Sequence, residues 1–425
     1  MTVFVFITSL LGAMALGMPI AFALMVCGVA LMFQVDIFDA QVLAQNLVDG
    51  ADSYPLMAVP FFLLAGELMN AGGLSRRIVN AVMAWVGHVR GGLGYVAVIT
   101  ALLLASLSGS AIADSAALAA LLIPMMREAG YNVGRSAGLL AAGGIIAPVV
   151  PPSIGLVLFG SIAGVSVSKL FIAGIVPGLM MAMSLLITWW WVCRKEAPAS
   201  QPLPASGARW NALRESGWAL ILPLIIIVGV KFGVFTPTEA GVVTAVCAAM
   251  VGAFAYRELT WSKLYEAMLA AARTSAVVMF LVAAALISAW LITVANIPDE
   301  LIKLLSPFID RPVILMILMQ LIVLIVGTAL DFTPTILILT PVLMPLVKAA
   351  GIDPVYFGVL FVMNNAIGLL TPPVGNVLNV VCSVGKVPMN EVIRGVMPFL
   401  YAETLVLILM SIFPSLMLVP FQWLR

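Results

Sequence analysis

Charged side chains are scarce in this chain. Asp, Glu, Lys and Arg make up only 9% of its 425 residues, whereas 63% of the residues are hydrophobic. Soluble domains carry about 25% charged residues, so a surface this poor in charge cannot be solvated well by water. The composition therefore predicts a protein surrounded by lipid. Because a spanning helix needs about 20 apolar residues, the length allows roughly ten spans.

Several binding and catalytic patterns are also missing. The net charge is +1, basic residues form no run, and no GxxxxGK[ST] loop occurs, so neither a nucleic-acid partner nor a nucleotide-driven motor is predicted. The four cysteines stand apart in apolar stretches, and the single histidine, His88, has no cysteine or carboxylate close by. Since paired acids, a metal-ligand set and a Ser/Lys dyad are all missing, we predict no enzyme activity and no organic cofactor.

The apolar N-terminal stretch is too long for the core of a signal peptide and lacks a positively charged start. We therefore predict that it is retained as the first crossing. Apolar stretches predict nine crossings: 3–33, 54–72, 136–165, 170–193, 217–235, 237–256, 274–296, 355–385 and 394–420.

Loop charges predict which side each loop faces, because Lys and Arg in short loops mark the cytoplasm. Residues 34–53 carry four Asp and no Lys or Arg, so we predict them outside, whereas 73–92 carry three Arg and are predicted inside. The stretches 194–216 and 256–263 are predicted inside by the same rule. Residues 194–216 are interpreted as a cytoplasmic linker between two halves, followed by a connecting span at 217–235.

Two long apolar segments do not fit single crossings. Residues 93–127 pause at the polar sequence SLSGSAIAD, and residues 312–348 pause at GTALDFTPT. About 35 residues is short for two crossings, so we predict two re-entrant hairpins with polar tips; two full helices joined by a loop are the alternative. The first hairpin is expected to enter from the cytoplasm and the second from outside. Each should follow an amphipathic arm, at 74–90 and 297–311.

The sequence matches itself at an offset of 221 residues, which predicts two related halves, 1–193 and 236–425. Seven glycine or proline positions coincide: Pro124/Pro345, Gly130/Gly351, Pro151/Pro372, Pro152/Pro373, Gly164/Gly385, Gly174/Gly395 and Pro177/Pro398. Four crossings in the first half plus the connecting span would invert the second copy. Inverted repeats with interrupted helices are typical of secondary transporters, whose substrate binds near the bilayer midplane.

Adjacent prolines interrupt the predicted crossings 136–165 and 355–385. Proline lacks an N–H, so the carbonyl four residues earlier loses its helical partner. The carbonyls concerned belong to Ala147, Pro148, Gly368 and Leu369. Unsatisfied carbonyls are costly in lipid, whereas a hard cation binds oxygen readily and the C-terminal end of a helix is partly negative. The breaks therefore predict sodium sites.

The hairpin tips offer complementary groups for an anion. Their hydroxyls belong to Ser106, Ser108, Ser110, Thr328 and Thr333. Half-helices that begin at the tips point positive ends at the midplane, which suits a carboxylate. Each tip also holds an acid, Asp114 or Asp331, which is costly within a membrane and so indicates a function. Alternatively, both acids cap a helix N-terminus.

Further polar groups flank the second break. They are Asn364, Asn365, Thr371 and Asn376. In the first half, Gly143 and Gly144 stand where the two neighbouring asparagines stand in the second, followed by Ser153. Close helix packing is an alternative explanation for the two glycines.

Six stretches together resemble one family, the DctM-like large membrane subunit of tripartite ATP-independent periplasmic (TRAP) transporters. The stretches are FFLLAGELMNAGGLSRRIV (61–79), LSGSAIADSAALAALLIPMM (107–126), GGIIAPVVPPS (143–153), FTPTEAG (235–241), DFTPTILILTPVLMPL (331–346) and GLLTPPVGNVLNV (368–380). The resemblance covers nearly the whole chain. It implies an elevator mechanism, in which a mobile domain of hairpins and broken helices slides against a scaffold.

The resemblance also implies partners and a driving force. A separate, small, four-helix membrane subunit (DctQ-like) and a periplasmic binding protein are expected, in the inner (cytoplasmic) membrane of a bacterium. The binding protein would deliver an organic acid, such as a sugar acid, and a sodium gradient rather than ATP would drive import. A self-sufficient sodium-coupled carrier of the dicarboxylate or citrate type is the alternative.

The resemblance implies ion sites where each hairpin tip meets its broken helix. These family positions correspond to Ser108, Ser110, Ser153, Asp331, Thr371, Pro372, Gly375 and Asn376. With the arguments above, the predicted sodium ligands are Ser110, Ala147, Pro148, Ser153, Asp331, Gly368, Thr371, Pro372, Gly375 and Asn376. The predicted substrate-binding residues are Ser108, Ser110, Asp114, Ser153, Thr333, Asn364 and Asn365.

Overall fold

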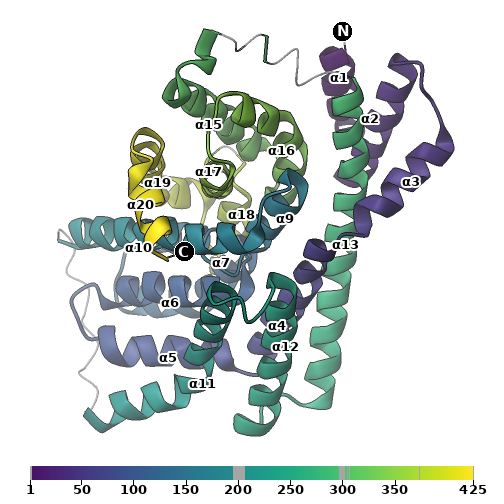
Figure 1. Cartoon of the computed structure of the whole chain (residues 1–425). Helices are drawn as coiled ribbons and strands as arrows, with labels where there is room; N and C mark the ends of the chain where they lie inside the picture. Colours follow the sequence, from purple (N-terminus) through teal and green to yellow (C-terminus); the bar gives the residue numbers. More distant parts are fainter. Residues whose placement is uncertain are drawn as a thin grey trace.

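The computed structural model describes residues 2–194, 206–295, 302–303, 305, 307–372 and 374–424. All regular structure in this part of the chain is helical, with no strand (Figure 1). Eight of the described helices are long and apolar enough to cross a membrane. The prediction of an all-α polytopic membrane protein is therefore confirmed. Residues 195–205 of the predicted linker 194–216, and residues 297–301, 304 and 306 of the second arm, 297–311, lie outside the described residues.

The first half consists of ten α-helices and one 3-10 turn. They are α1 (Thr2–Ala15), α2 (Ile20–Gln34), α3 (Ala40–Ala51), η1 (Tyr54–Met57), α4 (Ala58–Ala71), α5 (Leu74–Val86), α6 (Gly92–Ser108), α7 (Ala111–Glu128), α8 (Val133–Gly144), α9 (Ile154–Ala163) and α10 (Val167–Cys193).

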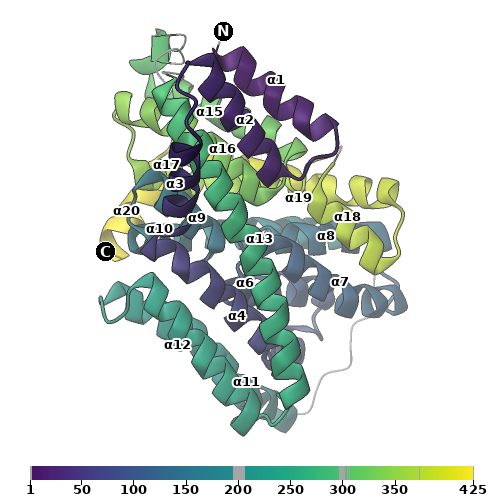
Figure 2. The ribbon, with the colours of Figure 1, turned by 90° about the vertical axis from the view of Figure 1, so that its right-hand side faces the viewer.

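The second part of the chain begins with α11 (Ser206–Lys231) and α12 (Pro237–Met250), which a π-turn, η2 (Val251–Ala255), extends. Figure 2 shows the long helix α13 (Trp261–Val294) running along the height of the molecule, with α11 and α12 packed together at one edge. The remaining helices are α15 (Pro312–Ala329), α16 (Phe332–Ala349), α17 (Pro354–Gly368), α18 (Asn376–Gly385), α19 (Met389–Ile412) and α20 (Ser415–Leu424).

Local sequence explains where the helices of the two predicted hairpins end and begin. Helix α6 stops at Ser108 because Gly109 adopts the left-handed conformation, with φ 61°, which glycine tolerates best. The next helix, α7, is capped by Ser110, whose hydroxyl accepts a hydrogen bond from the Ala113 amide at 3.4 Å. In the second hairpin, Asp331 caps α16 and accepts from the amide of the next residue, Phe332, at 2.8 Å.

Pro151, Pro152 and Pro372 lie within long breaks. Residues 145–153 separate α8 from α9, and Ser153 caps α9 by accepting from the Leu156 amide at 3.2 Å. Residues 369–375 separate α17 from α18 and include Gly375, with φ 47°. Pro373, predicted to form part of this break, lies outside the described residues. Both crossings are therefore interrupted helices whose halves are 10–15 residues long.

The helix bounds follow the 221-residue offset. Helices α7 and α16 are both 18 residues long and begin at 111 and 332, whereas α8 and α17 begin at 133 and 354. Contacts are repeated with the partners exchanged: α7 packs on α18 and α16 packs on α9, while α8 contacts α18 and α17 contacts α9. Such an exchange is the contact pattern that a two-fold axis produces.

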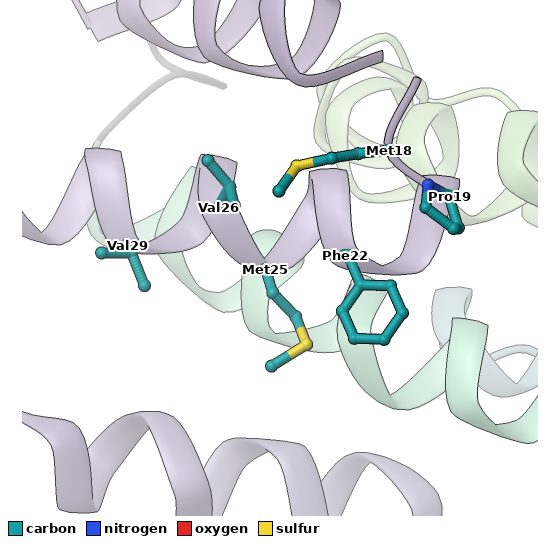
Figure 3. Close-up of a pocket in the computed structure, with 6 residues that line it drawn as sticks. All are labelled: Met18, Pro19, Phe22, Met25, Val26 and Val29. Atoms are coloured by element: carbon teal, nitrogen blue, oxygen red, sulfur yellow. The ribbon is translucent and has the colours of Figure 1, made fainter. Parts of the chain in front are cut away.

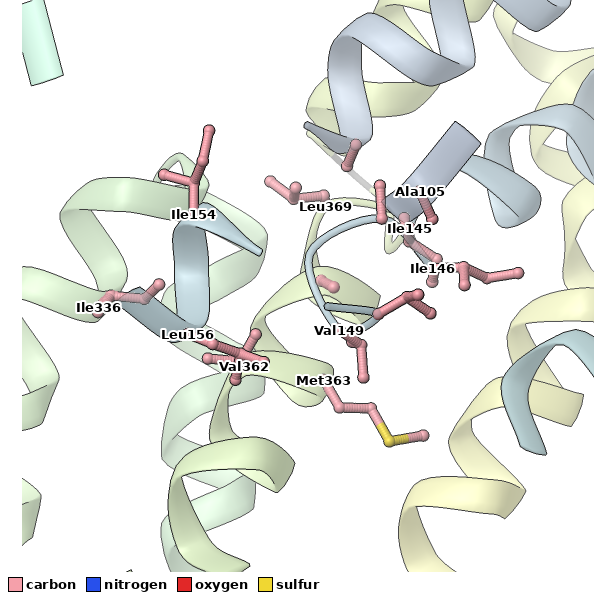
Figure 4. Packing of buried hydrophobic residues seen from close by; sticks show 14 of the residues in the cluster. Ala105, Ile145, Ile146, Val149, Ile154, Leu156, Ile336, Val362, Met363 and Leu369 are labelled. Atoms are coloured by element: carbon pink, nitrogen blue, oxygen red, sulfur yellow. The ribbon is translucent and has the colours of Figure 1, made fainter. Parts of the chain in front are cut away.

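The two broken helices run in opposite directions where they touch. A methyl group added at Gly155 in α9 would lie 3.4 Å from the Val362 side chain, and one added at Gly358 would lie 2.3 Å from the Phe159 ring. Residue numbers thus rise along α9 as they fall along α17. Figure 4 shows this region, with Leu156 of α9 and Val362 of α17 among the buried apolar side chains that line both helices.

One predicted crossing is wrong. Residues 3–33 fold as two antiparallel helices, α1 and α2, because Gly17 adopts φ 82° and Pro19 precedes α2. The Cys27 thiol contacts the Phe6 carbonyl at 3.5 Å across this pair. With 14 and 15 residues, each helix is about 21–23 Å long, shorter than the bilayer core of about 30 Å. The count of four crossings in the first half, from which inversion was predicted, is therefore no longer valid. The antiparallel packing of α9 and α17 supports inversion instead.

An ion-pair cluster joins two segments that are both predicted inside. Arg77 and Arg76 of α5 approach the Glu258 carboxylate, in the turn before α13, at 2.8 and 3.1 Å. The Arg77 guanidinium also stacks 3.8 Å above the Tyr256 ring. Burial raises the pKa of Glu258, but the hydrogen bond and charge of Arg77, with the charge of Arg76, outweigh burial and lower it overall. The cluster fixes α5 to the turn between α12 and α13.

Candidate functional site

The tip of the first hairpin lies against the first broken helix. A methyl group added at Gly109 would lie 3.2 Å from the Ile154 amide nitrogen and 3.4 Å from the Pro152 carbonyl oxygen. The tip hydroxyls of Ser108 and Ser110 are therefore brought to the region of the break that contains Ser153. This is the juxtaposition expected for the first predicted site.

Proline does not leave the Pro148 carbonyl oxygen without a partner. The Ser153 hydroxyl donates a hydrogen bond to it, and that same hydroxyl caps α9. Ser153 is fully buried and Ala147 nearly so. Because a carbonyl oxygen has two lone pairs, the Pro148 oxygen retains one position for a further donor or a cation. The Ser153 hydroxyl and the Pro148 carbonyl thus form an adjacent pair of oxygen atoms.

Asp114 is held by the tip rather than acting as a cap. The Ser108 hydroxyl donates to its Oδ1 at 2.5 Å, and the Ser110 amide donates to the Ser108 hydroxyl at 3.1 Å. Only 5% of Asp114 is exposed, and its Oδ2 is buried without a hydrogen-bond partner among the described residues. An unpaired buried carboxyl oxygen is costly. The interpretation that both tip acids are helix caps is therefore wrong for Asp114.

The second tip and second break are joined directly. Asp331 Oδ1 accepts from the Phe332 amide and, at 3.3 Å, from the side-chain amide of Asn376, the first residue of α18. The Asn365 side chain in α17 donates to the Phe332 carbonyl at 2.8 Å, which leaves its own Oδ1 buried and without a partner in the described structure. Three helices thus place Asp331, Asn365 and Asn376 around one point.

The carbonyls at the second break also find backbone partners. The Gly368 oxygen accepts from the Thr371 amide at 3.0 Å, and the Leu369 oxygen accepts from the Val377 amide at 3.3 Å. The Thr371 hydroxyl donates to the Ile367 carbonyl at 2.8 Å. As in the first break, each carbonyl retains a second lone pair. Pro372 is half-buried beside these oxygens.

Asn364 lies away from this point, although it neighbours Asn365 in the sequence. Its side-chain amide donates to the main-chain and side-chain oxygens of Gln320 in α15, at 2.5 and 2.7 Å. The structure thus pairs Asn364, a predicted substrate residue, with Gln320, which is not among the predicted site residues. Gln320 is a lone amide within the apolar run of α15, which is the signal that could have revealed it. Thr333 lies half-buried in the first turn of α16.

The polar groups of both sites are carbonyls, hydroxyls, the carboxyl groups of Asp114 and Asp331, and the side-chain amides of Asn365 and Asn376. In the described parts of the chain, no three His, Cys, Asp or Glu residues lie close enough together to hold a metal ion. Oxygen ligands without nitrogen or sulfur are typical of hard cations. The N-terminal ends of α7, α9, α16 and α18 lie at these same breaks and tips, so they can bind an anion beside a cation.

An apolar pocket on α2 lacks the polar groups that an organic anion needs. Figure 3 shows a pocket of about 490 Å³ lined only by apolar side chains of the turn before α2 and of α2 itself. Its lining residues are Met18, Pro19, Phe22, Met25, Val26 and Val29. Without a polar group it cannot fix the orientation of an organic anion, and it lies on α2 rather than at a tip.

Known proteins similar to this chain agree on one family. Residues 7–416 match the family model described as the DctM component of the tripartite ATP-independent periplasmic transporter. The chain is 54% identical over 425 residues, all of both chains, to the 2,3-diketo-L-gulonate TRAP transporter large permease protein YiaN of Escherichia coli (strain K12). It is 37% identical to the sialic acid TRAP transporter large permease protein SiaM of Vibrio cholerae over 405 residues, 95% of each chain.

A solved structure shares the fold. The crystal structure of the Alcanivorax borkumensis YdaH transporter, described as having an unusual topology, superposes with a TM-score of 0.65. The match covers 91% of this chain and 90% of that one at 15% sequence identity, so it supports the fold alone. The family model and the relatives go further: this chain belongs to the DctM family, the large permease component of tripartite ATP-independent periplasmic transporters.

Proposed function

We propose that this permease imports a sugar acid into a bacterium, using the sodium gradient across the inner membrane. The relatives named for 2,3-diketo-L-gulonate and sialic acid support a carboxylated sugar as the substrate. A periplasmic binding protein would deliver it, and a separate four-helix membrane subunit would complete the transporter.

The observation that carries sodium coupling is the junction at Asp331. Its carboxylate caps α16 and accepts from Asn376 at the start of α18, so it couples the hairpin to the broken helix. The carbonyls of Gly368 and Leu369 and the Thr371 hydroxyl supply further oxygens nearby. A sodium ion bound here would neutralise Asp331 and strengthen this junction. The pair formed by Ser153 and Pro148 is proposed to act likewise in the first half.

The substrate carboxylate is proposed to bind between the two tips. Helices α7 and α16 begin there, and their positive ends favour an anion. The unpaired oxygens of Asp114 and Asn365 would accept hydrogen bonds from substrate hydroxyls. Bound sodium ions would offset the charges of Asp114 and Asp331, which otherwise repel a carboxylate.

The proposed mechanism moves the hairpins and broken helices as one body, in the manner of an elevator. The exchanged contacts of α7 with α18 and of α16 with α9 support an inverted repeat, as do the antiparallel helices α9 and α17. Several pairs among these elements pack on one another, including α7 with α8 and α15 with α17, which supports movement as one body against a scaffold.

The test is uptake into proteoliposomes that contain the permease and its small membrane subunit, with the cognate binding protein added outside. Labelled gulonate, sialic acid and succinate would be compared with and without an inward sodium gradient. We expect a sugar acid to accumulate only with both sodium and the binding protein. Accumulation of succinate without the binding protein would instead support a self-sufficient dicarboxylate carrier, and sodium-independent uptake would refute the proposed coupling.

A further inference from the structure

A polar pocket of about 550 Å³ lies between α3, α9, α13 and α16. Its polar lining consists of Asn46 and Asp49 of α3, Thr293 of α13 and Lys348 of α16, beside the half-buried indole of Trp290. None of the predicted sodium or substrate residues lines it. The pocket therefore lies apart from the hairpin tips, and it joins helices of both halves of the chain.

The lining has one cation and several acceptors. The Asn46 amide N–H donates to the Val42 carbonyl at 2.8 Å, and the Thr293 hydroxyl donates to the Ala289 carbonyl at 3.1 Å. The Asn46 side-chain oxygen and the Thr293 hydroxyl oxygen therefore remain able to accept hydrogen bonds, and Asp49 adds its carboxylate to the lining. Lys348 can only donate. Although Asp49 and Lys348 share the pocket, these two described residues form no ion pair with each other.

A ligand that satisfies this lining has one carboxylate and several hydroxyls. The carboxylate would pair with Lys348, and hydroxyls would donate to Asn46, Asp49 and Thr293. A second carboxylate would share the pocket with Asp49, and like charges in one pocket repel. The indole of Trp290 adds a flat apolar wall, which is common in pockets that bind small molecules.

We propose that this pocket is a separate binding site for polyhydroxy monocarboxylates, in which Lys348 anchors the carboxylate and Asp49 rejects dicarboxylates. That the ligand of this pocket is the transported substrate rests on the proposed import of a sugar acid. The pocket itself is defined by its own lining residues. It would hold the substrate before it reaches the hairpin tips.

The equivalent position in the other half supports this assignment. Lys348 corresponds to Arg127 at the 221-residue offset, and Arg127 donates to the Gly385 carbonyl at the end of α18 at 3.2 Å. Gly385 corresponds to Gly164, next to Ala163 at the end of α9, and Ala163 lines the pocket with Lys348. In the first half, the hydrogen bond from Arg127 to Gly385 closes this position. In the second half, the equivalent position is an open pocket lined by Lys348.

The predicted sidedness fits delivery from a binding protein. Residues 34–53, which include α3, are predicted outside from their acidic charge, and the second hairpin is predicted to enter from outside with both ends there. The structure brings these two independently assigned segments together at the pocket. The site is therefore expected on the periplasmic side, where substrate arrives.

The test uses a reporter cysteine at the pocket. Ala163→Cys would be made with Cys247→Ala and Cys382→Ala, because the two other cysteines are buried. The permease and its small subunit, in lipid nanodiscs, would be labelled with a maleimide in the presence of gluconate, sorbitol or adipate. We expect millimolar gluconate to slow labelling at least fivefold, whereas sorbitol, without a carboxylate, and adipate, with two, leave the rate within twofold.

Further variants test whether Lys348 is responsible for the protection by gluconate. Adding Lys348→Met should abolish the protection by gluconate, and Lys386→Met, a lysine at the end of α18 outside the pocket, should preserve it. Asp49→Asn should allow adipate to protect. Thermal melting would show that each variant is folded. Three results would each overturn the proposal. The first is no protection by gluconate in the folded Ala163→Cys protein, and the second is protection by gluconate that persists after Lys348→Met. The third is equal protection by adipate while Asp49 is unchanged.

The labelling and uptake experiments distinguish failure of the proposed binding pocket from failure of the proposed transport function. Sodium-dependent uptake of a sugar acid without gluconate protection would refute the pocket and leave the transport function standing. Protection that requires Lys348, without any sodium-dependent uptake, would support the pocket and refute the proposed coupling.

Discussion

At the scale of single residues, the two tip acids have different structural roles. Asp331 is the N-cap of α16, and its equivalent at the 221-residue offset is Ser110, the N-cap of α7. Asp114 lies one turn into α7 and is held by Ser108. The carboxylate at the second tip therefore has no acidic equivalent at the first. This asymmetry indicates that the two proposed ion sites differ in charge and hence in affinity.

Replacing Asp331 by Asn is predicted to abolish sodium-dependent uptake while leaving the protein folded. Asn caps helices about as well as Asp, so the start of α16 is retained, but the charge that a cation would neutralise is lost. Uptake in proteoliposomes with and without a sodium gradient measures the effect, which we expect to exceed tenfold.

Asp353→Asn is the matched control. Asp353 is also an N-cap, of α17, where it accepts from the Val355 and Tyr356 amides at 2.7 and 3.0 Å. It does not contact α18 or a hairpin tip in the described structure, so uptake by this variant should stay near the wild-type rate. Wild-type sodium dependence in Asp331→Asn would refute the role assigned to Asp331.

Residue type at the second break was predictable, but side-chain direction was not. The sequence marks Asn364 and Asn365 together as polar residues in an apolar helix. Neighbouring residues on a helix point about 100° apart, and α17 is buried on all sides, so no amphipathic pattern shows which one faces the tip. The structure directs Asn365 to Phe332 and Asn364 to Gln320.

At the scale of helices, the prediction succeeded where proline, glycine and capping residues mark the ends. The predicted segments 93–127 and 312–348 each contain two helices separated by a short tip, and the breaks lie at the proline pairs. The failure at 3–33 has the same basis. Gly17 and Pro19 mark a turn there, but the surrounding apolar residues favoured one continuous span.

Replacing Pro372 and Pro373 by Ala is predicted to weaken sodium dependence. Alanine restores the N–H groups and favours helix over the break, which draws the nearby carbonyls into helical hydrogen bonds. The half-maximal sodium concentration for uptake should rise several-fold. Pro398→Ala is the control, because Pro398 lies inside the uninterrupted helix α19. An unchanged sodium affinity would show that the break is purely structural.

Glu258→Gln is predicted to destabilise the permease slightly, by about 1 kcal/mol or less, because two arginine contacts are weakened. The pKa of Glu258 is lowered overall in the folded state, so its contribution is present above the ordinary pKa of 4.5 and is lost as pH falls through the folded value. The Tm difference between wild type and variant should therefore be largest near pH 7 and shrink towards pH 4.

The control for this change is Glu266→Gln, on the exposed part of α13. Glu266 accepts only from the Ser262 hydroxyl, at 3.1 Å, among the contacts found in the described structure. Its replacement should leave the Tm within about a degree at both pH values. A Tm difference for Glu258→Gln that persists unchanged at pH 4 would argue against the ion-pair explanation.

At the scale of the whole molecule, the two halves are predicted to lie upside down relative to each other. Ala129 and Ala350 are equivalent residues just after α7 and α16. In cells, a membrane-impermeant maleimide should label Ala350→Cys directly, but should label Ala129→Cys only after permeabilisation. Labelling of both from the same side would contradict the inverted arrangement.

Much of the proposed overall arrangement could be inferred from the sequence, since the predicted repeat rests on widely spaced glycines and prolines that occur at equivalent positions in each half. The exchange of packing partners could not, because the apolar surfaces of α7, α9, α16 and α18 carry no pattern that selects one partner over another. Tertiary packing alone determines that α7 lies on α18 and α16 on α9.

The unequal ends of the two halves have a consequence for the proposed transport cycle. If each half adopts the conformation that the other has here, Lys348 comes to donate to the carbonyl of Gly164 and the 550 Å³ pocket closes, while Arg127 releases Gly385. In the proposed cycle, each end state would therefore be closed by a different cation: Arg127 in the state described here and Lys348 in the opposite state.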